Sequence, residues 1–199
     1  MHKPIIAIDV DGVLRDNLGI MVDIYNSEFN EDKKIEEITD FRTEVSFPRI
    51  ENETGKTASQ WFFQDHSTEI FLNAKPFKNV KEDVKRLQEY GEVVIITYQK
   101  SYKNKMETLK WLEDNEIEPS GIVFLKNKTL LNCDYLIDDN DWNFVGTRAR
   151  FGGLISAPYN KHISTWELSQ KAHCPIARFS SLNEFTEWFV KKEQEKTED

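Results

Sequence analysis

The stretch IIAIDVDGVLRD, residues 5–16, runs from an apolar segment straight into acidic side chains. Residues 5–8 are apolar and rich in isoleucine, which predicts a buried strand. Asp9 and Asp11 follow at once. Because residues two apart on an extended chain point the same way, both carboxylates can converge on one point. Two close carboxylates are stable only if a cation lies between them or one of them holds a proton.

A hard cation accounts for this pair of acids. Mg²⁺ takes oxygen ligands and prefers one or two carboxylates together with phosphate and water. Gly12 follows the second acid, where it allows a tight turn and lets a ligand approach the backbone N–H groups. In open parallel sheets, ligands bind at the carboxyl ends of the strands. The stretch therefore predicts a site for Mg²⁺ and phosphate where the first strand ends.

The composition describes an acidic globular protein of 199 residues, 39% of them hydrophobic and 31% charged, with a formal net charge of −9. This charge argues against binding to a polynucleotide, although one small anion can still bind at a local site. The two cysteines, Cys133 and Cys174, show no metal-binding spacing and suit a reducing compartment. The apolar run near the N-terminus is too short for a signal peptide or a membrane span. We expect a cytoplasmic monomer or homodimer that contacts no membrane.

Short apolar runs alternate with helical patterns along the rest of the chain. Val80 and Val84 recur at helical spacing before Gly91, and Met106 and Leu109 mark a second helix. The apolar runs are nearly continuous, as in strands that are covered on both faces. This alternation predicts an α/β protein with a Rossmann-like parallel sheet core flanked by helices. The predicted strands are residues 5–8, 93–96, 122–125, 135–137 and 154–155.

Residues 17–75 break this alternation. They begin as an amphipathic helix, continue through a charged region to an aromatic cluster, and contain no strong strand pattern. We therefore predict a small, mostly helical cap inserted after the first strand, with residues 1–16 and 76–199 forming the catalytic core. A lid at this place would exclude water and admit only a small substrate.

A second acidic pair, Asp138 and Asp139, also follows an apolar run. If the two strands are neighbours, four carboxylates meet at one edge of the sheet. Thr97 ends another run, and its hydroxyl group together with the N–H group of Tyr98 could hold an anion. The alternative is that the acids cap helices or form turns, and that Thr97 simply finishes a strand.

Lysines complete the charged set. Lys126 and Lys128 follow a further predicted strand. A lysine beside a carboxylate cluster balances charge and holds phosphate as a point charge. Taken alone, either lysine is better explained as a solvated surface residue.

The order D-x-D-G-V, strand-Thr, Lys, strand-Asp-Asp resembles the haloacid dehalogenase-like superfamily of phosphotransferases. The resemblance implies a Rossmann-like core, Mg²⁺ and a phosphoryl-aspartate intermediate. It makes Asp9 the nucleophile and Asp11 first the general acid and then the general base. The phosphate-binding residues are then Gly12, Thr97, Tyr98 and Lys128. The metal ligands are Asp9, Asp11 and Asp138, with Asp139 in support.

Within that superfamily the chain looks most like the 5′(3′)-deoxyribonucleotidases. The segments that carry this likeness are DVDGVLRD, EIFLNAKPFKNVKEDVKRL, KNKTLLNCDYLIDDN and SAPYNKHI. The Lys-Thr pair at Lys128 favours this lysine over Lys126. Two features depart from the family pattern. Arg15 stands in place of a small residue, and Tyr98-Gln99 follows Thr97 where the family usually has Ser-Pro.

The cap contains aromatic residues on which a base could stack, since aromatic faces stack on any base. We name Phe41, Trp61 and Phe62 as candidates for substrate contact; the alternative is that they form the cap's own core. Arg15 either faces the substrate or pairs with Asp16. The predicted activity is Mg²⁺-dependent hydrolysis of nucleoside monophosphates. The rivals are a phosphatase of sugar phosphates or other small phosphomonoesters, and a catalytically idle binding protein of the same fold.

Overall fold

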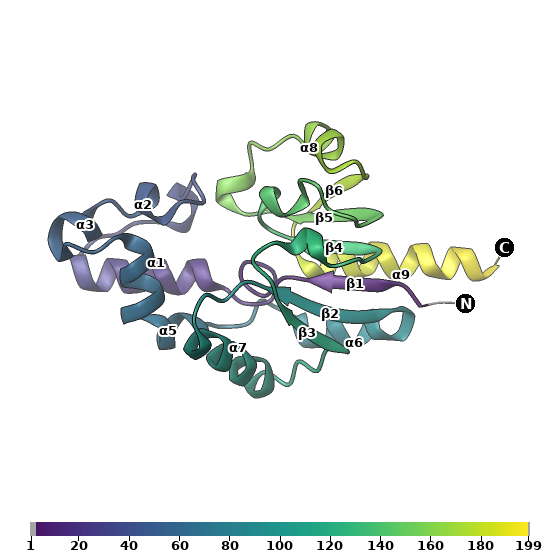
Figure 1. Cartoon of the computed structure of the whole chain (residues 1–199), viewed down its shortest axis with the longest axis horizontal. Coiled ribbons are helices and arrows are strands. Elements are labelled where there is room, and N and C mark those ends of the chain that lie inside the picture. The colour runs from purple at the N-terminus through teal and green to yellow at the C-terminus, as the bar shows by residue number, and fades with distance from the viewer. Residues whose placement is uncertain (1–2, 199) are drawn as a thin grey trace.

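A six-stranded parallel sheet forms the centre of the protein in the computed structural model, which describes residues 3–198 (Figure 1). The strand order is β3-β2-β1-β4-β5-β6. This is the order of doubly wound α/β folds. The chain adds β2 and β3 on one side of β1 and then returns to add β4, β5 and β6 on its other side, so the order of addition reverses between β1 and β4. The strands are β1 (Ile5–Ile8), β2 (Glu92–Thr97), β3 (Gly121–Phe124), β4 (Tyr135–Asp138), β5 (Phe151–Ile155) and β6 (Ile176–Phe179).

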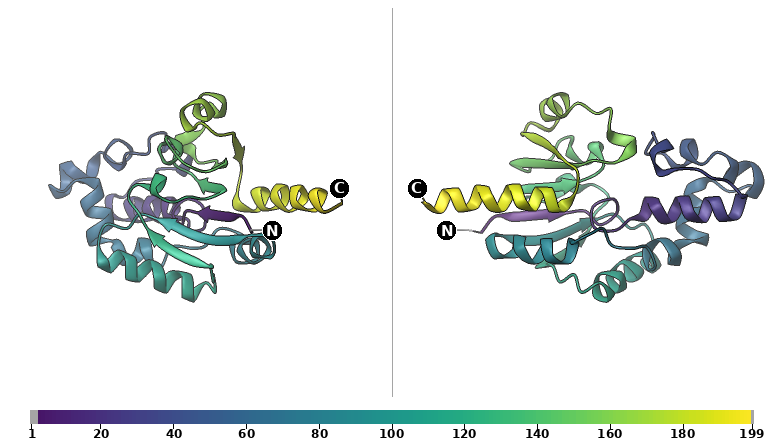
Figure 2. Two further views of the ribbon diagram at one scale, coloured as in Figure 1. Left: turned by 45° about the vertical axis from the view of Figure 1, so that its right-hand side comes forward. Right: turned by 180° about the vertical axis from the view of Figure 1, so that it is seen from behind.

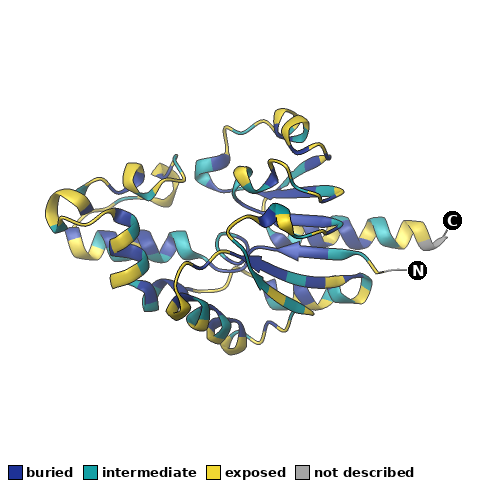
Figure 3. Cartoon of the chain, viewed as in Figure 1, coloured by how far each residue is buried: buried dark blue, intermediate teal, exposed yellow. Residues whose placement is uncertain are grey.

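The first strand lies in the middle of the sheet. Ile6 is in register with Val93 of β2 on one side and with Tyr135 of β4 on the other. The central strands are buried on both faces (Figure 3), which explains their continuous apolar sequences. The predicted α/β fold with a Rossmann-like parallel sheet is confirmed.

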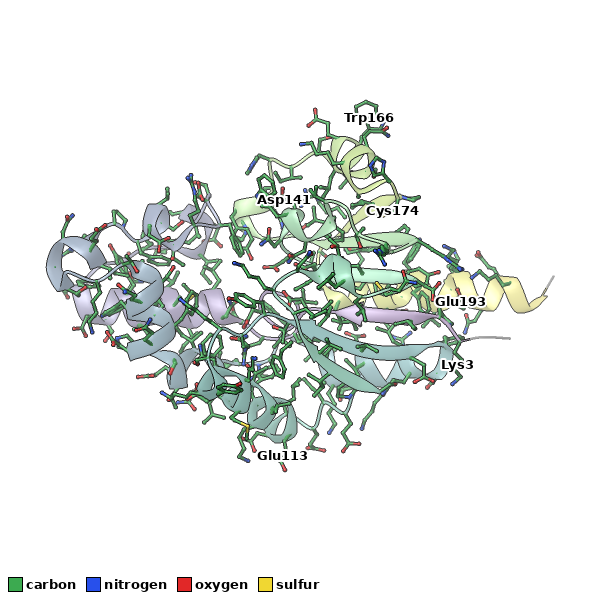
Figure 4. The ribbon with its side chains drawn as sticks, viewed as in Figure 1. Lys3, Glu113, Asp141, Trp166, Cys174 and Glu193 are labelled. Atoms are coloured by element: carbon green, nitrogen blue, oxygen red, sulfur yellow. The ribbon has the colours of Figure 1, made fainter. Side chains whose placement is uncertain are left out.

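Helices cover the two faces of the sheet unequally. On one face, α6 (Val80–Tyr90) and α9 (Leu182–Glu198) pack against each other and the sheet. The other face is covered by α8 (Thr165–Ala172) and by short 3₁₀ helices, with Trp166 pointing outward from α8 (Figure 4). Among these, η4 (Asp141–Phe144) contributes Phe144 to the core on this face, while η3 (Lys128–Leu130) and η5 (Pro158–Asn160) follow β3 and β5 near the ends of the strands. The helix α7 (Tyr102–Asp114) connects β2 and β3.

The segment between β1 and α6 forms a separate helical layer beyond the ends of the strands (Figure 1). In both views of Figure 2 this layer lies at the end of the molecule opposite the two termini. Its apolar side chains pack into a core of their own. We call it the cap; the boundaries 16/17 and 75/76 stay a prediction. Its elements are α1 (Asn17–Phe29), η1 (Ile35–Glu37), α2 (Thr43–Ser46), α3 (Arg49–Thr54), α4 (Ala58–Gln60), the π-helix η2 (Trp61–Asp65) and α5 (Ser67–Phe71).

The two chain segments that join the cap to the core run side by side. The N–H group of Asp16 donates to the carbonyl oxygen of Lys75 at 2.9 Å, and that of Phe77 donates to Leu14 at 2.8 Å. The Asp16 side chain also caps α1 by accepting from Gly19 N at 2.8 Å. The cap is therefore attached through a short, hydrogen-bonded ribbon.

Several local predictions differ from the structure. The sixth strand, β6, was not predicted, because its sequence IARF is short and contains an arginine. The helix α7 was predicted correctly, but its apolar face was not: Met106 is 65% exposed, while Trp111 is fully buried.

The structure also describes the state of the two cysteines and the apolar character of the helices. Cys133 and Cys174 are both free thiols, buried on the α8 face of the sheet. Among residues 3–198, no helix combines the length and the apolar character that crossing a membrane requires.

The cap core provides a test of this packing. Phe62 is fully buried in it, so Phe62→Ala should lower the free energy of unfolding by about 3–5 kcal/mol. Phe41 is 55% exposed, and Phe41→Ala should cost less than about 1 kcal/mol. Urea-induced unfolding of both variants measures the difference. Equal losses would contradict the description of the cap core.

Candidate active site

Three neighbouring strands deliver their last residues to one edge of the sheet. Asp9 follows β1, Thr97 ends β2 and Asp138 ends β4, and β1 lies between the other two. The reversal of strand order between β1 and β4 leaves a crevice there, which is the usual ligand site of such sheets. The sequence-predicted acids therefore meet because of the topology.

Asp9, Asp138 and Asp139 form a buried cluster in which one carboxylate oxygen of each residue lies within 4.8 Å of the others. The ammonium group of Lys128 lies 2.7 Å from Asp9 Oδ2 and 2.7 Å from Asp138 Oδ2. The side-chain amide of Asn143 donates to both oxygens of Asp138 as well. One ammonium group thus holds together two of the three carboxylates.

The site perturbs the ionisation of these groups. Burial raises the pKa of Asp9 to about 7, although the nearby Lys128 ammonium group opposes the shift. Burial and then the repulsion from Asp138 and Asp9 hold the pKa of Asp139 well above its usual range. Burial alone would lower the pKa of Lys128, but the carboxylates of Asp138 and Asp9 together raise it. The cluster is therefore short of positive charge.

The donor set fits a hard divalent cation. Three carboxylate oxygens close together, in a site with too little positive charge, are the ligands that Mg²⁺ prefers. Asp9, Asp138 and Asp139 would hold the ion. The carboxylate of Asp11 is not part of this cluster, although the sequence placed it among the ligands. Asp139, which the sequence placed in a supporting role, is part of it.

Asp139 is fixed by residues of the loop after β5. The hydroxyl group of Tyr159 donates to its Oδ2 atom. The side-chain amide of Asn160 donates to the carbonyl oxygens of Asp139 and Ile155, both at 2.7 Å. Tyr159 was not among the predicted site residues. The SAPYNKHI segment contained the signal, since it is one of the segments that carry the family likeness and it includes Tyr159.

Asp11 has partners of its own. Its Oδ1 atom accepts from Arg15, and its Oδ2 atom accepts from the side-chain amide of Gln99 at 2.9 Å. Arg15 is fully buried and is not among the residues that line the pocket described below. The prediction that Arg15 contacts substrate, or else pairs with Asp16, is therefore wrong: the buried guanidinium group needs a charged partner, and Asp11 supplies it.

The predicted phosphate-binding residues lie in different places. Thr97, Tyr98 and Lys128 all line the pocket. Gly12 does not line it: its N–H group donates to the carbonyl oxygen of Arg15 at 3.0 Å, and its contact with phosphate stays a prediction. Its φ of +78° suits glycine, and a Cβ atom there would collide with the carboxylate of Asp139. Gly12 therefore makes room for Asp139.

A cavity of about 1120 Å³ lies between the cap and the ends of the strands, with Asp9, Asp11 and Lys128 in its lining. Both polar and aromatic side chains of the cap reach it. Phe41 and the exposed Lys126 both line it, and substrate contact by Phe41 stays a prediction. The aromatic residues that line it are Phe41, Phe47, Phe63, Phe71, Tyr98 and Tyr159.

Trp61 and Phe62 do not line this cavity. Trp61 packs on Phe29 with ring centroids 5.4 Å apart, and Phe62 packs edge-on against Phe47 at 4.9 Å. Both are buried inside the cap. The prediction that these two residues contact substrate is corrected: their large apolar surfaces fill the core that holds the short cap helices together.

The fold is the one found in haloacid dehalogenase-like proteins. The solved structure of a haloacid dehalogenase-like family hydrolase from Streptococcus pneumoniae matches with a TM-score of 0.60 at 14% identity, over 94% of this chain and 98% of that chain. More narrowly, residues 3–173 match the model of the family described as 5′ nucleotidase, deoxy (pyrimidine), cytosolic type C protein, and the chain belongs to this family. It is therefore an enzyme of the phosphoric monoester hydrolase class.

Curated relatives agree with this assignment. The relatives include proteins from two species that carry the name "Putative 5′(3′)-deoxyribonucleotidase". The one from Staphylococcus aureus strain Mu50 is 28% identical over 84% of this chain and 93% of its own length. The one from Staphylococcus epidermidis strain RP62A is 30% identical over 70% of this chain and 76% of its own length.

The raised pKa of Asp9 predicts how stability depends on pH when metal is removed with EDTA. The folded protein keeps the Asp9 proton up to about pH 7, whereas the unfolded chain loses it near the ordinary value of 3.8. The folded state binds more protons in between, so this carboxyl group costs stability as the pH rises through that window. Asp9→Asn removes the cost.

The free energy of unfolding of Asp9→Asn, relative to wild type, should therefore increase between about pH 4 and about pH 7. Chemical unfolding at several pH values in EDTA measures this difference. Asp23→Asn, which changes an exposed carboxylate of α1, should give a constant difference. A constant difference for Asp9→Asn would contradict the raised pKa.

Proposed function

We propose that this chain is a Mg²⁺-dependent phosphatase that hydrolyses nucleoside monophosphates, deoxyribonucleotides above all, through a phosphoryl-Asp9 intermediate. The observation that carries the proposal is the position of the Lys128 ammonium group, which lies 2.7 Å from Asp9 and 2.7 Å from Asp138. Lys128 and Asp9 both line the cavity. A phosphate dianion can approach a carboxylate only where cations and donors neutralise the site. Bound Mg²⁺ would supply the additional positive charge for the phosphoryl oxygens.

In the first step, a carboxylate oxygen of Asp9 forms a bond to phosphorus and the bond from phosphorus to the ester oxygen breaks. Asp11 donates its proton to the leaving oxygen, so the nucleoside departs as an alcohol. The ammonium group of Lys128 and the hydroxyl group of Thr97 hold the phosphoryl group. This step needs Asp9 to be ionised, which the adjacent Lys128 favours.

In the second step, Asp11 takes a proton from water as the water oxygen attacks phosphorus. The bond between phosphorus and Asp9 breaks, phosphate leaves, and Asp11 is protonated again for the next cycle. Both carboxylates line the cavity, Asp9 nearly buried and Asp11 with 21% of its side chain exposed. This difference suits a nucleophile shielded from solvent and an acid/base group that water can reach.

Several observations support a nucleotide as the substrate. The cavity of about 1120 Å³ has room for a small molecule under the cap, and its aromatic lining offers stacking surfaces. The family description and the names of the relatives point the same way. The free thiols Cys133 and Cys174 support action in the cytoplasm.

One feature of the cavity favours the rival substrate class. The cap contributes polar residues to the lining, including Glu44, which accepts a hydrogen bond from the Ser59 hydroxyl group at 2.7 Å. Such groups could bind the hydroxyl groups of a sugar phosphate. No observation favours the alternative of a catalytically idle binding protein, because every residue type that the two steps need lines the cavity.

The test is phosphate release from deoxyribonucleoside and ribonucleoside monophosphates and from several sugar phosphates, with Mg²⁺ and with EDTA. We expect Mg²⁺-dependent release with the highest kcat/KM for deoxyribonucleotides, and a loss of at least about 10³-fold in Asp9→Asn. Asp23→Asn should retain full activity. Release from sugar phosphates alone would overturn the proposed substrate, and release that survives EDTA would overturn the metal dependence.

A further inference from the structure

Both oxygens of the Asp11 carboxylate are held by side chains outside the metal-binding cluster. Its Oδ1 atom is 2.9 Å from Arg15 Nε and 2.8 Å from a terminal nitrogen of the same guanidinium group. Its Oδ2 atom accepts from the side-chain amide of Gln99 at 2.9 Å. The two donors come from different parts of the chain: Arg15 lies in the segment after β1, and Gln99 lies in the segment after β2. Together they fix both the position of the carboxylate and the rotation of its plane.

Arg15 is itself immobilised. Its guanidinium carbon lies 5.2 Å from the ring centroid of Phe71 and 5.1 Å from that of Trp111. Its remaining N–H groups donate to the carbonyl oxygen of Phe71 and, at 3.3 Å, to the hydroxyl group of Thr108. Among the described residues, Asp11 is the carboxylate with which Arg15 forms an ion pair. A fully buried cation of this kind cannot turn away from that partner without losing its compensation.

The groups around Arg15 belong to both parts of the molecule. Phe71 ends α5 in the cap, whereas Thr108 and Trp111 belong to α7 in the core. The indole N–H group of Trp111 donates to the carbonyl oxygen of Ala74 at 2.7 Å, in the segment that leads back from the cap to the core. Arg15 therefore ties Asp11 to the point where the cap is attached.

We propose that Arg15 and Gln99 are positioning residues for the acid/base carboxylate of Asp11. Neither would touch the reacting atoms; together they would keep Asp11 aimed at the oxygen that it protonates and later at the water that it deprotonates. Each carboxylate oxygen can accept more than one hydrogen bond, so the contacts leave Asp11 free to exchange a proton. The inference rests on the proposed phosphatase function and adds to it the source of the acid/base geometry.

The decisive variants are Arg15→Met, which keeps an apolar side chain between the two rings, and Gln99→Leu. In each, kcat for a deoxyribonucleoside monophosphate should fall about 100-fold, because a displaced acid/base group loses most of its contribution. The inhibition constant of inorganic phosphate should stay within about threefold, since Lys128 and Thr97 are unchanged. With p-nitrophenyl phosphate, whose leaving group needs no proton, a burst of p-nitrophenolate should precede slow turnover.

The readout that separates positioning from general damage is a double-mutant cycle with Asp11→Asn. Once Asp11 has lost its acid/base function, adding Arg15→Met or Gln99→Leu should change kcat by less than about threefold. Arg49→Met is the matched control: Arg49 also lies over a phenylalanine ring, at 5.6 Å, and pairs with carboxylates, but it does not line the cavity. It should retain the activity of the wild type.

Each result has a distinct meaning. An undiminished kcat in both variants of an active enzyme would overturn the positioning role alone. The same conclusion would follow if the losses were as large in the Asp11→Asn background as in the wild type. A wild-type enzyme that releases no phosphate would overturn the proposed function and the positioning role with it. If Arg15→Met does not fold, as judged by circular dichroism, Gln99→Leu decides between the outcomes.

Discussion

The pair of contacts that Lys128 makes with Asp9 and Asp138 is the interaction on which the site depends. Three carboxylates and one ammonium group leave two uncompensated negative charges if all of them are ionised. Burying such charges is costly unless they are paired. The folded chain can balance them by keeping protons or by binding a divalent cation. The raised pKa values of Asp9 and Asp139 show the tendency to keep protons. A site that is short of two charges is suited to Mg²⁺.

Two buried cations serve two different carboxylates. Lys128 is a compact point charge, and it can contact Asp9, Asp138 and a phosphoryl group without a fixed plane. Arg15 has a planar guanidinium group that lies over the rings of Phe71 and Trp111, and in our proposal it fixes the orientation of Asp11. The division follows the proposed chemistry: the proposed nucleophile, Asp9, needs charge compensation, whereas the proposed acid/base group, Asp11, needs a fixed geometry.

The sheet and the acidic residues were predictable because their signals are local or follow from general topology. Continuous apolar runs predicted five of the strands, and the rule that parallel strands end at one edge predicted that Asp9, Thr97 and Asp138 would meet. The faces of the cap aromatics were not predictable, since Phe41 and Phe62 differ only in tertiary packing. The same holds for Arg15, whose partners Phe71 and Trp111 are 56 and 96 residues away. The contacts of the Asp11 carboxylate with Arg15 and Gln99 were not predictable either, because spacing shows proximity but not hydrogen-bond partners.

The central claim is that Asp9 is the group that attacks phosphorus. Rapid acid quenching during turnover of a deoxyribonucleoside monophosphate, followed by mass spectrometry of the peptides, tests it most directly. We predict a phosphoryl group on the peptide that contains Asp9, formed and lost at rates that account for turnover. Turnover with no phosphoryl group on this peptide, or with one on another residue, would contradict the mechanism and would point to direct attack by water or to another nucleophile.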